Sequence, residues 1–160
     1  MQNGKRLIII LAAAALVLAA VLTAVIIRSN SQSKFTPPEF DAAAVEGMPA
    51  PPESLHWAKA DLTLYTVYAA SVLTVQDGST DIYFTNPAEN AVWVKLRLLD
   101  AQGAVLGETG LLKPGQYVQK IKLEKIPADG SAVSLKIMAY EPDTYHSAGS
   151  AAMKTTISVP

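Results

Sequence analysis

The sequence predicts an all-β fold, an immunoglobulin-like antiparallel β-sandwich of about seven or eight strands preceded by one N-terminal transmembrane helix. Two observations predict the sandwich. Beyond the first third of the chain, short runs alternate apolar and polar residues, which is the period of half-buried strands. Turn signals rich in Gly, Pro, Asp and Asn separate these runs about every 8 to 12 residues. A third observation, a long uncharged stretch near the start of the chain, predicts the membrane helix.

The uncharged stretch covers residues 7–27, where Thr23 is a mild polar interruption. A helix of this length is about 31 Å long at a rise of about 1.5 Å per residue, which matches a hydrocarbon core of about 30 Å. A cleaved signal peptide is the alternative, although its apolar region is usually shorter and no small-x-small cleavage pattern follows Ile27. We therefore expect an uncleaved anchor at residues 7–27.

Charges on either side of this helix predict its orientation. Lys5 and Arg6 precede the helix, and Arg28 and Lys34 follow it. With the free amine, the short side carries the excess of positive charge that marks the cytoplasmic side. The expected arrangement is a single-pass protein of the cell membrane, with residues 1–6 inside the cell and the C-terminal domain outside.

Residues 28–58 are rich in proline and serine, and five of the ten prolines of the chain lie there. Such a composition does not bury enough apolar surface to fold, and proline stiffens the chain toward extended conformations. The segment therefore predicts a stalk. The stretches "FTPPEF" and "MPAPPES" could instead be ligands of a proline-binding module, but outside a cell a spacer is the preferred interpretation.

Residues 59–160 are expected to form the sandwich. In "AVWVKLRLLD", residues 91–100, alternate side chains point to opposite faces, so an aliphatic set faces the core and the other set faces solvent. The stretches "YVQKIKLEKI" and "AVSLKIMAYE" repeat this alternation. Further strands are expected at Leu62–Tyr68, Ser71–Gln76, Asp81–Asn86, Ala104–Gly107 and Met153–Val159.

Four glycines occur in "LLDAQGAVLGETGLLKPGQY", residues 98–117. A phosphate-binding glycine loop must follow a strand and open a helix, whose N-terminal amides meet the anion. The pattern that follows these glycines is that of another strand, so they are interpreted as turns, a bulge and a bend between strands.

The pattern "VKLRLLDAQGAVLGETGLLKPGQYVQKIKL" combines a strand ending in Leu-Asp, a glycine turn, an apolar return strand and a Pro-Gly entry into another strand. In these features, and over the stretch from Tyr83 to Val159, the chain resembles the FxLYD-type immunoglobulin-like domains of membrane-anchored surface proteins in Gram-positive bacteria. The resemblance implies an accessory extracellular β-sandwich. It carries over no catalytic residues.

Composition excludes several classes of function. The chain has 13 basic and 14 acidic side chains, so it lacks the basic stripe of a nucleic-acid-binding protein. It has no cysteine, which excludes disulfides, thiol catalysis and thiolate metal sites. No cofactor and no resident metal are expected.

One loop, "EPDTYHSAGS", gathers residues that could carry chemistry, namely Glu141, Asp143, His146 and Ser147. A Ser/His/Asp site requires a nucleophile elbow and an oxyanion hole, and a calcium loop requires alternating Asp or Asn ligands. Neither pattern is present, so a solvated loop is the preferred interpretation. Lys154 and Asp61 could form an isopeptide bond only with the roles of the first and last strands reversed, so a surface pair is the preferred interpretation.

A candidate binding patch lies on the polar side of residues 91–100. Trp93, Lys95 and Arg97 share that side, and Lys136 and Tyr140 of a second strand could join them. Aromatic side chains beside cations suit a sugar, an anionic polymer or a protein contact. The alternative is ordinary cross-strand packing of an aromatic residue on a solvated face.

These observations predict a non-enzymatic extracytoplasmic binding or assembly module, tethered to the membrane by residues 7–27. The expected partner is a protein or a cell-wall polymer, and not a nucleic acid. One alternative is a structural subunit of an envelope secretion, conjugation or adhesion complex. A less favoured alternative is a metal-dependent binder or envelope enzyme, for which a deep cleft around the His146 loop would be the sign.

Overall fold

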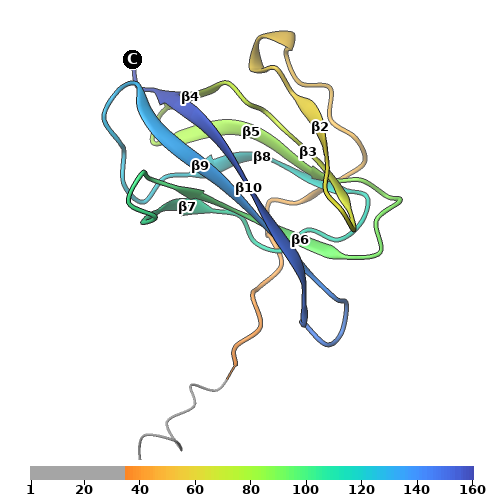
Figure 1. Ribbon diagram of the computed structural model, residues 1–160. Coiled ribbons are helices and arrows are strands. Elements are labelled where there is room, and N and C mark those ends of the chain that lie inside the picture. Colours follow the sequence, from red (N-terminus) through yellow and green to blue (C-terminus); the bar gives the residue numbers. More distant parts are fainter. Residues whose placement is uncertain (1–34) are drawn as a thin grey trace, which may run out of the picture. The chain divides into compact units, whose positions relative to one another are not determined.

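Strands make up most of the regular structure in residues 35–160, the part of the chain that the computed structural model describes (Figure 1). The all-β prediction is confirmed, and a single 3-10 turn, η1 (Glu53–Leu55), accompanies the strands. The strands are β1 (Val45–Glu46), β2 (Ala58–Asp61), β3 (Thr66–Ala69), β4 (Leu73–Gln76), β5 (Ser79–Asn86), β6 (Trp93–Leu99), β7 (Val105–Glu108), β8 (Gln116–Lys122), β9 (Ser131–Tyr140) and β10 (Ser147–Ser158).

These strands form a curled sheet with two facing layers. One layer has the order β1-β8-β5. Strand β3 pairs with the edge of β5 opposite β8, and β2 pairs with β3. The other layer has the order β10-β9-β6-β7. Strand β4 joins the layers, because it pairs antiparallel with β5 and parallel with β10. Figure 1 shows β9 and β10 crossing in front of β5 and β8.

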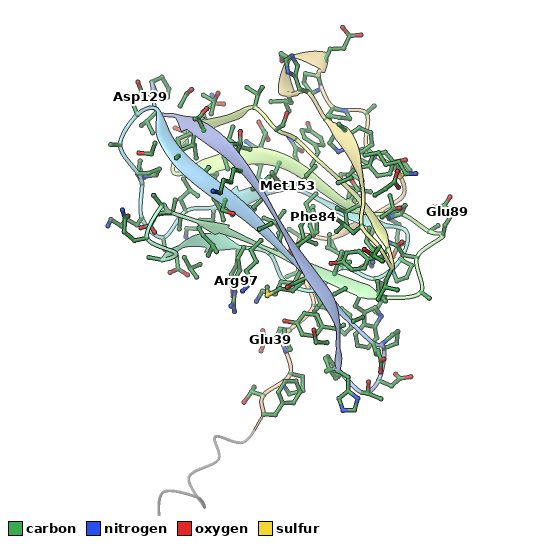
Figure 2. All side chains as sticks on the ribbon, in the orientation of Figure 1. Glu39, Phe84, Glu89, Arg97, Asp129 and Met153 are labelled. Carbon is green, nitrogen blue, oxygen red and sulfur yellow. The ribbon has the colours of Figure 1, made fainter. Side chains whose placement is uncertain are left out.

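The core lies between the two layers, where the alternation along the strands directs aliphatic side chains inward. Phe84 of β5, Leu96 of β6 and Ile137 of β9 are fully buried members of one core cluster. Figure 2 shows Phe84 between the layers and Arg97 projecting away from them. The aliphatic residues at alternate positions of β6 and β9 are buried, so the inward-facing set predicted for both strands is confirmed.

The structure differs from the predicted strands in several places. Residues 62–65 form a turn, closed by hydrogen bonds between Leu62 and Tyr65, so the strand expected from Leu62 begins at Thr66. Strand β2 begins at Ala58, the last residue of the predicted stalk, and pairs with β3, although no strand was expected at residues 58–61. The parallel pairing of β4 with β10 also departs from an entirely antiparallel sandwich.

Most of the predicted stalk, from Pro37 on, belongs to the β-rich unit, which spans Pro37–Pro160 and therefore begins before residue 59. Phe40 forms a parallel bridge with Leu111. The Asp41 carboxylate accepts a hydrogen bond of 2.8 Å from the Gly110 amide, and β1 pairs with β8. Proline-rich composition did not reveal these pairings, because the partners lie about 70 positions further along the chain.

Trp57, at the end of the expected stalk, is also fixed to the unit. Its ring stacks on Tyr68 at a centroid distance of 4.6 Å, and its Nε1 donates to the Tyr83 carbonyl at 2.8 Å. Tyr83 has a φ of 45° and lies at a register shift in β5. The bulge therefore turns a strand carbonyl toward Trp57.

The predicted membrane helix at residues 7–27 lies outside the described residues, as do the cytoplasmic segment 1–6 and the start of the stalk. Within residues 35–160, no helix has the length and apolar character needed to cross a membrane.

Candidate functional site

The five residues of the predicted patch lie on the outer face of two neighbouring strands. Trp93 is directly opposite Tyr140, and Arg97 is directly opposite Lys136, in the register of β6 with β9. Lys95 lies between them on β6. Inward-facing residues alternate with this set and fill the core, so the outer position of all five follows from the strand period.

Trp93 is enclosed by two aromatic residues that the sequence interpretation missed. Phe40 meets its ring edge-to-face at 4.8 Å, and Tyr145 meets it at 5.2 Å. Lys113 lies over the Phe40 ring at 4.8 Å. Phe40 lies in the Pro-rich segment and Tyr145 in the loop between β9 and β10, and no local pattern links either residue to β6.

Lys95 and Arg97 share one carboxylate. The Lys95 Nζ lies 2.7 Å from one Glu108 oxygen, and the Arg97 Nε lies 2.7 Å from the other. Arg97 and Glu108 are cross-strand partners of β6 and β7. Lys95 is only 8% exposed, so the structure corrects the expectation that its ammonium is a free surface group. A lysine is rarely buried in this way unless it is paired.

The two cations change the titration of Glu108. Partial burial by itself raises the pKa of a carboxyl group, but hydrogen bonds from Lys95 and Arg97 together outweigh burial and hold the Glu108 pKa below its usual value. An acid with a lowered folded-state pKa stabilises the fold above its unfolded-state pKa. That contribution is lost as the pH falls through the folded-state pKa.

We expect Glu108→Gln to destabilise the fold by about 2 kcal/mol at pH 7, because the buried Lys95 ammonium loses its carboxylate. Urea unfolding measures this change, and the variant should lose less stability than the wild type between about pH 5 and pH 3. The matched control is Asp61→Asn, which breaks the exposed Lys59–Asp61 pair and should cost under about 0.5 kcal/mol. Equal costs for the two variants would contradict the buried pairing of Lys95.

A shallow cleft of about 500 Å³ adjoins this ion-pair group. The segment from Pro38 to Ala42 forms one wall, and Lys95, Glu108 and Gly110 contribute to the other. The cleft opens beside the Phe40 ring, so aromatic and charged groups border the same space.

A row of cations crosses the outer face beyond this group. Arg97 of β6 faces Lys136 of β9, and Lys136 faces Ala152 of β10, two residues from Lys154. Among the described residues, Lys136 and Lys154 form no ion pair. The single negative charge of Glu108 offsets one of the two cations that it contacts. The outer face of these strands therefore keeps a net positive charge.

The His146 loop forms no enclosed site. His146 Nδ1 lies 3.8 Å from a Glu141 oxygen, with the two side chains 79% and 56% exposed. The principal cavities are lined by other segments. Within residues 35–160, no cluster of three or more His, Asp or Glu residues could hold a metal ion.

No family model and no curated protein matches the sequence. Among solved structures, the chain is similar to CopC from Methylosinus trichosporium OB3b. The likeness has 16% sequence identity and a TM-score of 0.36, and covers 65% of this chain and 95% of that one. The resemblance to FxLYD-type domains stays a prediction.

Proposed function

We propose that residues 37–160 form a non-enzymatic binding module of the immunoglobulin-like type, held outside the cytoplasm by a membrane anchor at residues 7–27. The module recognises an anionic partner through the outer face of β6, β9 and β10. The anchor rests on the uncharged stretch in the sequence. The recognition face rests on the row of Arg97, Lys136 and Lys154.

The observation that carries this proposal is the arrangement of charge on a rigid face. Paired strands hold Arg97 and Lys136 side by side, although two like charges directly opposite each other cost stability. An anion placed between the two side chains removes that repulsion, which gives the face a preference for negative groups. The aromatic group around Trp93 borders the row and offers apolar contact area.

An anionic cell-wall polymer and an acidic protein share the chemistry that this face recognises. The alternative of a structural subunit in an envelope complex has no specific support in the described residues. An envelope enzyme or metal-dependent binder would need a site around His146, which is open to solvent.

The test is equilibrium binding of the full chain, held in neutral detergent micelles, to long-chain polyphosphate and separately to an acidic Glu-rich peptide. We expect Arg97→Gln combined with Lys136→Gln to weaken binding about 5- to 30-fold, since each exposed charge contact contributes up to about 1 kcal/mol. The matched control is Lys122→Gln combined with Lys125→Gln, which removes two exposed cations at and just after the end of β8.

The control pair should leave the affinity within about twofold. Stronger binding of polyphosphate would identify a polymer partner, and stronger binding of the peptide would identify an acidic protein. Equal losses for the two variant pairs would show unspecific attraction to net charge and would contradict the proposed face. Absence of binding to both probes would also contradict it.

A further inference from the structure

Strand β10 has a long free edge. Strand β9 pairs with it from Ser147 to Ile157, whereas on the opposite side β4 pairs only with Ile157 and Ser158. Residues 149–156 therefore have no strand on that side within the described part of the chain. Alternate residues of an antiparallel strand direct their N–H and C=O groups away from the partner, so about half of these residues present backbone groups to the open edge.

The other strand edges in the described residues are short or protected. Strand β1 has two residues and β7 has four. Strand β2 has four residues and carries the exposed Lys59–Asp61 pair. Charged and short edges resist the addition of another strand. In β10, by contrast, residues 147–153 carry no charge, and Lys154 is the charged residue of the strand.

The core is incomplete beside this edge. Met153 is directly opposite Leu135 and faces the same side, but it is only half-buried, whereas Leu135 is 2% exposed. Ala151 is likewise half-buried opposite the fully buried Ile137. Figure 2 marks Met153 on β10. Apolar groups that face the core but stay exposed gain free energy when another element covers them.

A cleft of about 280 Å³ borders the same edge. Asp61 at the end of β2 and the turn at residues 62–65 form one wall, and residues 148–151 of β10 form the other. Leu64 is 74% exposed on the turn. Tyr65 also lines the cleft and is only 7% exposed. Its hydroxyl nevertheless has no hydrogen-bond partner among the described residues. A buried hydroxyl without a partner costs stability, so this corner of the cleft is not fully satisfied within the described residues.

We infer that the free edge of β10 docks one extended polypeptide strand of a partner protein. The strand adds to the sheet beside residues 149–154 and places an apolar side chain in the cleft beside Leu64. An added strand needs only about 4.8 Å beside β10. Residues 61–65 lie across the cleft from β10 and limit the space there, so the site suits a single strand better than a whole second copy of the chain. Because residues 147–153 are uncharged, the complementary strand is apolar and uncharged.

This site uses an edge of the sheet, not the outer face on which the proposed anionic partner binds. The two binding events are therefore separable by experiment, and failure of one leaves the other standing.

The test uses amide hydrogen exchange of the full chain in neutral micelles, followed by NMR. The probe is the uncharged synthetic peptide SAVSLTIMAY, which is the sequence of β9 with Lys136 replaced by threonine. It has the side-chain alternation that pairs with β10. Without peptide, fast and slow amides should alternate along residues 149–156. Added peptide should slow exchange of the fast amides at least about tenfold.

Leu64→Asp tests the cleft without disturbing the core, because its side chain is largely exposed. We expect it to weaken peptide binding at least about tenfold. The matched control is Ile126→Asp, at a half-exposed position outside the residues that line the cleft, which should leave binding unchanged. Three results would overturn the inference: slow exchange of all these amides without peptide, protection that grows with protein concentration, or equal effects of the two variants.

Discussion

Gly107→Ala is expected to destabilise the fold by about 3 kcal/mol, at the upper end of the usual cost of overpacking. A Cβ at this position would lie well inside van der Waals contact with the Lys122 carbonyl oxygen, and 2.9 Å from Ile121 Cγ2. The carbonyl belongs to β8, where Lys122 is held in register with Ser79 of β5. Backbone paired in this way moves only if the ladder moves with it.

Urea unfolding of the full chain in neutral micelles measures this cost, and Gly130→Ala is the control. Gly130 has a φ of 70° and no atom within 4 Å of a built Cβ, so alanine there adds left-handed backbone strain of about 1 kcal/mol and no collision. A loss at Gly107 no larger than the loss at Gly130 would contradict the close approach of β7 to β8.

Asn86→Ala is expected to cost about 3 kcal/mol of unfolding free energy. The Asn86 side chain is fully buried, and its Nδ2 donates to the carbonyls of Val92 at 2.9 Å and Leu112 at 3.0 Å. Its Oδ1 accepts from Asn90 Nδ2 at 2.6 Å. Alanine removes three hydrogen bonds, each of which contributes about 1 kcal/mol. The Leu112 carbonyl keeps the Val94 amide as a donor, and the Asn90 side chain keeps the Thr66 carbonyl as an acceptor.

The matched control for Asn86 is Gln119→Ala. Gln119 is exposed and makes one hydrogen bond of 3.2 Å to Asp81, so its loss should change stability by under about 0.5 kcal/mol. Thermal unfolding followed by near-ultraviolet circular dichroism compares the two variants. A similar small change in both would show that Asn86 does not hold β5 to the segments before β6 and β8.

The strands whose side chains alternate strictly were predictable from the sequence. In β6 and β9 the period of two separates inward-facing from outward-facing residues, and hydrophobic burial on the inner face fixes the register. The position of the five patch residues on one outer face follows from the same period. Their use in binding stays a prediction.

The surroundings of the patch were not predictable, because they depend on contacts between distant segments. Glu108 reaches Lys95 only through the pairing of β6 with β7, and a solvated face was the natural expectation for a lysine in an alternating strand. Phe40 lies 53 positions before Trp93, in a segment whose prolines suggested a spacer. Local patterns report propensity and period, and they do not report which distant segment covers a face.

The most direct test of the recognition face is site-specific photo-crosslinking in intact cells. A photoreactive residue replaces Lys136 on the outer face or, in a matched chain, Lys122 at the end of β8. We predict crosslinks to an anionic envelope component from position 136 that Arg97→Gln weakens, and few from position 122. Equal crosslinking from both positions, or crosslinks at position 136 that Arg97→Gln leaves unchanged, would contradict recognition through the face of β6, β9 and β10.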